Sequence, residues 1–262
     1  MKPEISIVIR TLNEAKHLPS LLSAIRSQKI NMSYEIVLID SGSTDKTIEI
    51  AKKFKCRITH IAKADFSFGR SLNKGIRFSK GNYLVFISGH CVPKNQNWLE
   101  NLVIPIVEKK VAYTYGKQLA DNSSFWSERQ IYKKYFPDKK KLPQVGFFCN
   151  NANSAILKAT WKKYLFDEDL TGLEDLDLAK RLTNDGGRVG YIPEAAVYHF
   201  HNESWAQIRR RFEREAIALK KIMPTLIIKK RDLIRYIIMG ILNDVFSENN
   251  FLYNIKKLPN II

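Results

Sequence analysis

The sequence predicts an α/β fold in which a mostly parallel central sheet is flanked by helices. Four short, β-branched apolar runs occupy the first ninety residues, and amphipathic segments lie between them, which is the alternation of a doubly wound sheet. Near-continuous apolar character in three of these runs indicates strands that are buried on both faces. Because 45% of the 262 residues are hydrophobic, the chain can build a real core, and global disorder is excluded.

The expected elements follow in order along the chain. In the first half, strands are predicted at residues 5–9, 35–39, 57–61 and 83–87, with helices at 18–25, 48–54 and 72–78. Apolar residues spaced three and four apart, such as Leu18, Leu21, Leu22 and Ile25, indicate those helices. The second half is less regular, with predicted helices at 98–107, 125–136 and 174–184 and strands at 111–117, 188–192 and 196–200.

The charge balance is strongly basic. Lys and Arg number 43 against 26 Asp and Glu, a formal net charge of +17. Such a surplus predicts an anionic partner: nucleic acid, a phosphorylated substrate or an acidic membrane surface. From residue 205 onward, twelve basic and five acidic residues give a net of +7 in 58 residues, with apolar residues interleaved. We therefore expect a basic, amphipathic helical extension over residues 205–262.

The cysteines, the N-terminus and the apolar runs indicate the cellular compartment in which the protein is expected. Cys56, Cys91 and Cys149 lie far apart and form neither a disulfide nor a zinc framework, which favours a reducing compartment. The N-terminus carries no signal-peptide pattern, and the apolar stretch 233–242 is interrupted by Arg235 and is shorter than the roughly 20 residues that span a bilayer. A cytoplasmic protein is expected.

Polar residues follow three of the predicted strands. They are residues 10–14 after the first strand, 40–45 after the second and 88–90 after the fourth. In open α/β sheets, ligands bind beyond the carboxyl ends of the strands, so these segments are the candidate site. Residues 40–45 also open a helix, and an ordinary capped turn is the alternative interpretation of that stretch.

Two of these segments carry a specific resemblance. Residues 8–14 (VIRTLNE) and 37–47 (VLIDSGSTDKT) closely resemble the opening of the family 2 glycosyltransferases, inverting enzymes with the GT-A fold. Residues 68–75 resemble the third motif of the family, residues 173–178 its Glu-Asp motif, and residues 198–201 its histidine-bearing strand. The resemblance covers roughly residues 4–220.

The resemblance implies a GT-A catalytic domain over residues 1–204, with a nucleotide-binding half at about 1–118 and an acceptor-binding half at about 119–204. It implies a sugar-nucleotide site built from Thr11, Asn13, Glu14, Asp40, Ser41, Arg70, Asn73, Ser88, Gly89 and His90. Acceptor or phosphate contacts are expected from Asn151, Asn153, His199, His201 and Arg209. A polar turn is the alternative for residues 150–153, although side-chain amides suit sugar hydroxyls.

One segment departs from the family pattern. Members usually carry Asp-x-Asp after the fourth strand to hold a divalent cation, whereas this chain has Ser88-Gly89-His90. A hydroxyl and an imidazole are poorer ligands than two carboxylates for Mg²⁺. Three alternatives stay open: Mn²⁺ bound by His90 with His199 or His201, neutralisation of the leaving phosphate by Arg and Lys side chains, or a donor with a single phosphate.

An inverting transfer needs a general base near the acceptor hydroxyl and positive charge near the leaving phosphate. The Glu-Asp pattern implies that Asp175 is the base and that Glu174 orients it or an acceptor hydroxyl. The alternative is that both acids merely favour a helix N-terminus.

The implied function is an inverting glycosyltransferase that builds a bacterial polysaccharide or lipopolysaccharide. Its partners are a nucleotide-sugar donor, a glycan or lipid-linked glycan acceptor and an anionic membrane surface on the inner face of the plasma membrane. The basic extension either binds that membrane or packs on the domain with a solvated basic face. A non-catalytic nucleotide-sugar-binding protein is the alternative, and no nucleic-acid-binding motif is present, so no specific nucleic acid is expected.

Overall fold

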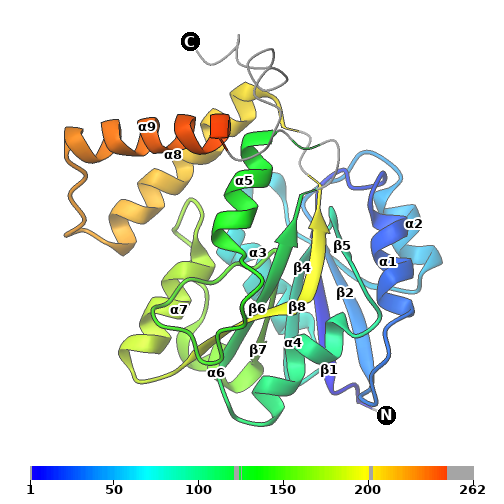
Figure 1. Cartoon of the computed structure of the whole chain (residues 1–262). Coiled ribbons are helices and arrows are strands. Elements are labelled where there is room, and N and C mark those ends of the chain that lie inside the picture. The colour runs from blue at the N-terminus through cyan, green and yellow to red at the C-terminus, as the bar shows by residue number, and fades with distance from the viewer. Residues whose placement is uncertain (1, 121–123, 125, 201–202, 247–262) are drawn as a thin grey trace.

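The structure is a computed structural model that describes residues 2–120, 124, 126–200 and 203–246. Its centre is one eight-stranded sheet in the order β3-β2-β1-β4-β7-β6-β8-β5, with helices on both faces (Figure 1). The strands of the described residues are β1 (Ile5–Thr11), β2 (Tyr34–Asp40), β3 (Arg57–His60), β4 (Tyr83–Ser88), β5 (Cys91–Pro93), β6 (Tyr113–Leu119), β7 (Asn153–Leu157) and β8 (Val189–His199).

The α-helices lie between these strands and after the last one. They are α1 (Leu18–Arg26), α2 (Thr47–Lys53), α3 (Phe68–Phe78), α4 (Trp98–Val107), α5 (Trp126–Tyr135), α6 (Lys158–Tyr164), α7 (Glu174–Asn184), α8 (Trp205–Ile222) and α9 (Lys230–Phe246). The α/β class with a mostly parallel sheet, predicted from the alternating periodicities, is confirmed.

The first four strands form the regular half of the sheet. β1 pairs in parallel with β2 and β4, and β2 pairs in parallel with β3. Their carboxyl ends therefore lie at one edge, where Thr11 pairs with Asp40 and Arg10 with Ser88. The segments expected to form the site follow these ends.

The second half of the sheet is mixed. β7 is antiparallel to both β4 and β6, whereas β6 is parallel to β8. The sequence analysis predicted two strands at 188–192 and 196–200, and this was wrong, because the chain continues as the single strand β8. The pairing shifts register between Gly116 and Gln118, opposite Ile192 and Val197, and this irregularity carries β8 past the proline at position 193. The short strands β5 and β7 and the helix α6 were not predicted.

The apolar residues form one core on each face of the sheet. Alternate residues of β1 point to opposite faces, so Ile5, Ile7 and Ile9 join one core and Val8 the other. The first core is covered by α1 and α4, whose Trp98 is fully buried. The second is covered by residues of α3, α5, α6 and α7. Two buried faces explain the near-continuous apolar runs of these strands.

The expected extension consists of two helices of different character within the described residues, and residues 247–262 lie outside them. Ala218 and Ile222 of α8 are buried against Leu170, whereas α9 projects beyond α5 and exposes most of its apolar side chains (Figure 1). Across the described ranges, no helix combines the length and the apolar character that crossing a bilayer requires.

Candidate active site

Two loops at the carboxyl ends of β1 and β2 are joined by side-chain to backbone hydrogen bonds. The N–H of Asn13 donates to Oγ of Ser43 at 2.8 Å, and Oδ1 of Asn13 accepts from the N–H of Thr44 at 2.8 Å. The N–H of Glu14 donates to Oγ1 of Thr47 at 2.8 Å. Asn13 lies at φ +57°, a left-handed conformation that asparagine tolerates better than most residues. The loops therefore form one rigid unit.

The carboxylate of Asp40 stabilises the turn that follows β2. It is only 2% exposed and accepts from the backbone N–H groups of Gly42 at 3.0 Å and Ser43 at 2.9 Å. Oγ1 of Thr11 donates to it at 3.1 Å, and the N–H of Ser41 donates to the carbonyl of Thr11 at 3.0 Å. Thr11, Asp40 and Ser41 thus lie together at this edge, and the capped-turn interpretation describes the carboxylate hydrogen bonds of this structure.

The turn after β4 brings His90 to the same edge. Nδ1 of His90 lies 2.7 Å from Oε1 of Glu14, and the N–H of Phe200 donates to the carbonyl of His90 at 3.0 Å. Gly89 fits here because an added Cβ would lie 2.7 Å from Cγ of Glu14 and 3.0 Å from the carbonyl oxygen of Arg10. Close packing at Gly89 therefore sets the position of the imidazole.

The histidines of this region stack. The rings of His90 and His199 lie 5.0 Å apart at 17°, and Nδ1 of His199 lies 2.6 Å from Oε1 of Gln118. Two imidazoles with the Glu14 carboxylate, which is bonded to His90, are a poor ligand set for a hard divalent cation that prefers several oxygen ligands. In the part of the chain that the structure describes, no three His, Cys, Asp or Glu residues are grouped to hold a metal. His201, the other predicted ligand, lies outside the described residues.

Glu174 and Asp175 begin α7 and are almost fully buried, at 4% and 8% exposed. Nη1 of Arg10 donates to Oε1 of Glu174 at 3.3 Å, which joins the first strand to this helix. The N–H of Asn151 donates to Oδ2 of Asp175 at 2.7 Å, and the N–H of Leu176 donates to Oδ1 at 2.8 Å. The structure therefore holds the two predicted catalytic acids side by side.

Burial raises the pKa of Asp175 from 3.8 to about 7, and the negative charge of Glu174 acts in the same direction. The hydrogen bonds from Asn151 and Leu176 and the charge of Arg10 partly oppose this rise. A carboxyl group with a pKa near neutrality can accept a proton from a hydroxyl and hold it, which is what a general base requires.

Arg70 and Asn73 lie on α3, and the structure gives them different surroundings. Nε of Arg70 donates to Glu168 at 3.1 Å, and Arg70 lines a cavity of about 500 Å³ with Ile61, Asp65, Lys74, Arg77 and Glu168. The amide of Asn73 donates to Phe166 and Glu168 and accepts from Trp161 and from the N–H of Phe166. Because all four of its hydrogen-bonding positions are used within the protein, Asn73 has a structural role here.

The two asparagines predicted to bind the acceptor are separated. Asn151 lies beside Glu174 and Asp175, with its Oδ1 accepting from Tyr113 and Ser154. Asn153 is fully buried in β7, where its amide binds Trp98, Lys117 and Ala195. The side chain of Asn153 therefore supports the first core, and only Asn151 contacts the carboxylates.

Arg10, Phe68 and Arg214 were not singled out as site residues by the sequence analysis, although residues 10 and 68 lie in segments that it named. Arg10 and Arg214 each place a guanidinium 4.9 Å from the ring centre of Phe68, and Arg10 also binds Glu174. A charged residue at the end of an otherwise apolar strand was the available signal for Arg10. The predicted Arg209 is instead exposed and pairs with Glu213 on α8.

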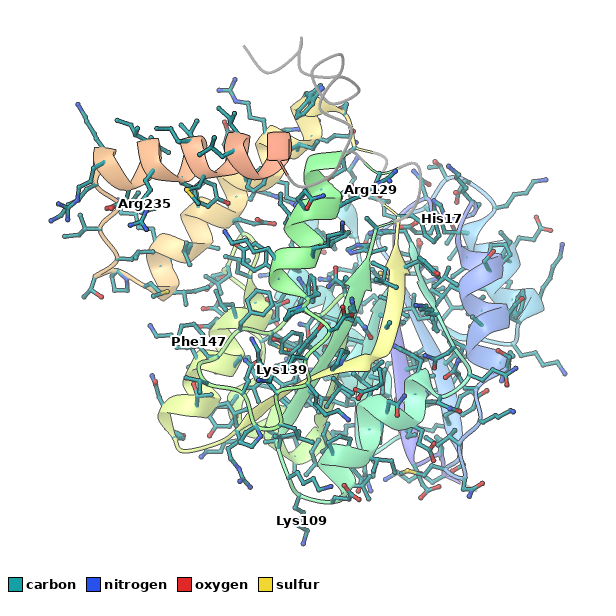
Figure 2. The ribbon with its side chains drawn as sticks, in the orientation of Figure 1. His17, Lys109, Arg129, Lys139, Phe147 and Arg235 are labelled. Atoms are coloured by element: carbon teal, nitrogen blue, oxygen red, sulfur yellow. The ribbon has the colours of Figure 1, made fainter. Side chains whose placement is uncertain are left out.

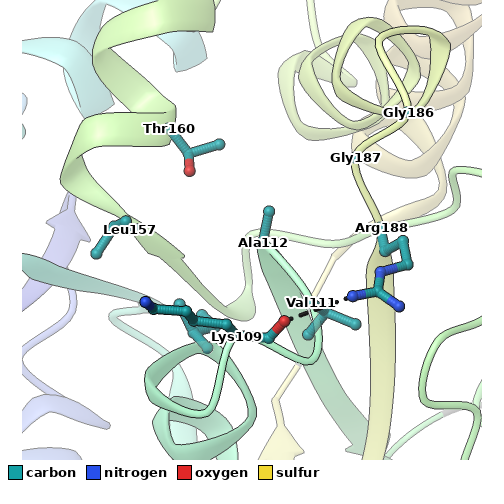
Figure 3. A pocket seen from close by; sticks show the side chains of 9 residues that line it. Lys109, Val111, Ala112, Leu157, Thr160, Gly186, Gly187 and Arg188 are labelled. Carbon is teal, nitrogen blue, oxygen red and sulfur yellow. Dashed lines mark hydrogen bonds between the residues drawn. The ribbon is translucent and has the colours of Figure 1, made fainter.

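A second cavity lies at the other end of the sheet. It has a volume of about 260 Å³ and is lined by residues near the amino ends of β6 and β8, with Arg188 donating to the carbonyl of Lys109 (Figure 3). Figure 2 places Lys109 at the opposite end of the molecule from His17, whose ring stacks on Phe200 at 4.8 Å. None of the predicted site residues lines this second cavity.

Comparison with solved structures supports the fold. S. aureus TarS 1–349 superposes with a TM-score of 0.62 at 17% identity, covering 97% of this chain and 75% of that one. The mannosyltransferase PcManGT from Pyrobaculum calidifontis, solved with GDP-Man and Mn²⁺, gives a TM-score of 0.64 at 16% identity, covering 93% and 70%. At these identities the likeness establishes the GT-A-like architecture.

Sequence comparison establishes the family. The O-antigen chain rhamnosyltransferase WbaN of Salmonella anatum is 28% identical over 71% of this chain, and RfbN of Salmonella typhimurium is 27% identical over 76%. The aligned regions cover only 62% and 67% of those two relatives. The profile described as Glycosyl transferase family 2 matches residues 6–165, more than half of the chain. The protein belongs to glycosyl transferase family 2.

Proposed function

We propose that this glycosyltransferase moves a sugar from a nucleotide-sugar donor to a hydroxyl of a growing glycan or lipid-linked acceptor, with inversion at the anomeric carbon. The Salmonella relatives carry names that place them in O-antigen chain synthesis as rhamnosyltransferases, so we propose O-antigen or a related surface polysaccharide as the product. A lipid-linked acceptor places the reaction at the inner face of the plasma membrane. The buried pair of Glu174 and Asp175 is the observation that carries the proposal.

The donor is proposed to bind along the edge formed by the loops after β1, β2 and β4. Thr11, Glu14, Asp40 and Ser41 meet there, and the cavity beside Arg70 adjoins the end of β3 through Ile61. Arg70, Lys74 and Arg77 line that cavity together with two acids, and Arg70 is proposed to contact the base or ribose of the donor. Asn13, Ser88 and Gly89 are proposed to shape the loops, and Asn73 to position α3.

Asp175 is proposed as the general base. Its carboxylate removes the proton from the acceptor hydroxyl while that oxygen forms a bond to the anomeric carbon. The bond from the anomeric carbon to the phosphate oxygen breaks on the opposite face, and the nucleotide leaves with the electron pair. Glu174, held by Arg10 at 3.3 Å, fixes the start of α7 and keeps the base in place.

Positive charge near the leaving phosphate is proposed to come from side chains. Arg10 and Arg214 converge on Phe68 and are proposed to supply this charge. The His90 ring is held by Glu14 at the end of β4 and is proposed to contact the donor. His199 supports His90 by stacking, and Asn151 borders the acceptor side of the carboxylates. No three potential ligands are grouped to hold a metal within the described residues, and the steps above are therefore assigned to side chains.

Replacing Asp175 by asparagine tests the catalytic role. We expect turnover to fall by about 10²–10⁴-fold, the usual contribution of a positioned base, with nucleotide binding retained. Calorimetry with UDP, dTDP, GDP, CDP and CMP, each with Mn²⁺, Mg²⁺ or EDTA, identifies the nucleotide. Release of nucleotide from the matching sugar donor then measures turnover. A wild-type protein that binds nucleotide and never turns over the donor would instead support the non-catalytic binding protein.

A further inference from the structure

The two C-terminal helices of the described chain differ in how they meet the domain. α8 is attached: Oγ1 of Thr171 donates to the carbonyl of Arg214 at 2.7 Å, and Nζ of Lys180 donates to the carbonyl of Ile222. Ala218 and Ile222 are buried against Leu170. The basic residues of α8 therefore belong to a helix that is packed on the catalytic domain, and they do not define a separate binding device.

α9 has an aliphatic face that the described residues leave uncovered. At 100° per residue, six aliphatic side chains fall within one half of the helix circumference, and each is 42–57% exposed: Leu233, Ile234, Ile237, Ile238, Ile241 and Leu242. Three more, Leu226, Ile227 and Ile228, precede the helix at 46%, 77% and 67% exposed. We call these nine residues the aliphatic face. A contiguous exposed apolar surface of this kind marks an interaction site.

One residue on the other half of α9 contacts the domain. Tyr236 falls outside the aliphatic half, and the ammonium of Lys134 on α5 lies 5.4 Å from the centre of its ring. Contacts to α5 hold the helix against the body of the protein, and Figure 1 shows α8 and α9 projecting together on that side. The aliphatic face is therefore presented outward while the helix stays attached.

Cations surround the aliphatic face. Lys229, Lys230, Arg231 and Arg235 lie within or beside it against one acid, Asp232, which gives residues 226–242 a net charge of 4 − 1 = +3. Lys230 and Arg231 lie at the start of the helix, on the same half of its circumference as the aliphatic residues. Aliphatic side chains beside lysine and arginine are the combination that holds a helix in the interface of an anionic bilayer.

We propose that the aliphatic face of α9 inserts into the interfacial layer of an anionic phospholipid bilayer, with the flanking cations on the lipid headgroups. The helix then lies in the plane of the membrane, as its length and charge require. Because α9 contacts α5 of the catalytic domain, membrane attachment through α9 brings that domain to the lipid surface. This inference rests on the proposed function, because it names the surface at which the enzyme would meet a lipid-linked acceptor.

Vesicle sedimentation with the full chain tests the inference without donor or acceptor. We expect the protein to sediment with vesicles of phosphatidylcholine containing 30% phosphatidylglycerol, and to bind pure phosphatidylcholine at least tenfold more weakly. Ile237→Asp should reduce binding to the anionic vesicles by tenfold or more. Met239→Asp is the matched control, since Met239 lies on the other half of the same helix and is 57% exposed against 50% for Ile237. It should change binding less than threefold.

The outcomes separate the alternatives. Sedimentation that is absent with both lipids, or equal losses from Ile237→Asp and Met239→Asp, would overturn the proposal. A wild-type dimer that Ile237→Asp converts to a monomer, without vesicle binding, would show that a second copy covers the face. Nucleotide binding should be unchanged in Ile237→Asp. Vesicle binding that persists in a protein without transferase activity would leave this inference standing and refute the proposed function.

Discussion

Asp175→Asn is predicted to stabilise the fold while it removes activity. The wild-type carboxylate is buried beside the negatively charged Glu174. Burial and this charge raise its pKa from 3.8 to about 7. Asparagine keeps nearly the same shape and carries no charge, but its single amide oxygen can accept from only one of the two N–H groups, those of Asn151 and Leu176, that the carboxylate binds. Because the lost hydrogen bond is the same at every pH, the pH dependence of the variant's stability isolates the free-energy cost of ionising this residue in the folded state.

The size of that cost follows from the pKa. A rise of about 3 pH units, at 1.36 kcal/mol per unit, means that ionised Asp175 lowers the free energy of unfolding by about 4 kcal/mol. Because the pKa is higher in the folded state, the wild type keeps its full stability below pH 4. It loses stability progressively as the pH rises from 4 to 7. The stability of Asp175→Asn relative to the wild type should therefore be lowest at pH 4 and reach its maximum above pH 7.

Urea unfolding of both proteins at pH 4.5, 6 and 8 measures this difference. Asp185→Asn, directly after the end of the same helix, is the control, since the Lys163 and Tyr164 hydrogen bonds lower the pKa of the exposed Asp185. Its effect should have the opposite sign, a small destabilisation at pH 8 that fades in acid. An Asp175→Asn protein that is less stable than the wild type at pH 8, or a difference that does not change with pH, would refute this reasoning.

Three further changes test other parts of the site. Arg10→Gln should lower the free energy of unfolding, measured in urea, by about 3 kcal/mol, because it leaves the buried Glu174 carboxylate without its guanidinium partner. A loss below about 1 kcal/mol would argue against a stabilising ion pair between Arg10 and Glu174. Gly89→Ala should cost about 1–3 kcal/mol and weaken nucleotide binding in calorimetry, since its Cβ would press on Glu14; unchanged affinity would contradict this. Asn73→Ala should cost about 2–4 kcal/mol by leaving buried partners unsatisfied, and a nearly neutral melting temperature would be inconsistent with its structural role.

Much of the fold follows from local patterns. The parallel strands were predicted because burial on both faces makes them almost entirely apolar, and this signal is contained in each segment. β7 gives no such signal: it begins with Asn153-Ser154, and it is defined by antiparallel pairing with β4, whose residues lie about seventy positions away. β8 was divided in the prediction because Pro193 and Glu194 interrupt its apolar run, whereas pairing with β6 carries the strand across them.

The site residues also divide into those that local motifs predict and those that depend on the folded structure. Residues of the two loops were predicted from motifs at strand ends, and the structure brings Asn13, Asp40 and Thr11 together there. The sequence does not distinguish an asparagine that faces a ligand from one that is saturated inside the core, so Asn73 and Asn153 were predicted as binding residues. The contact between Arg10 and Glu174 joins positions 164 residues apart and depends on the completed sheet.

The cross-bonded loops after β1 and β2 have a consequence for protein engineering. Asn13 and Glu14 take hydrogen-bonding partners from Ser43, Thr44 and Thr47, so neither loop keeps its shape when the other is exchanged. A donor-specificity transplant from a relative must therefore move residues 11–15 and 40–47 together as a single cassette. Natural variants at these positions are expected to change in matched sets rather than one at a time.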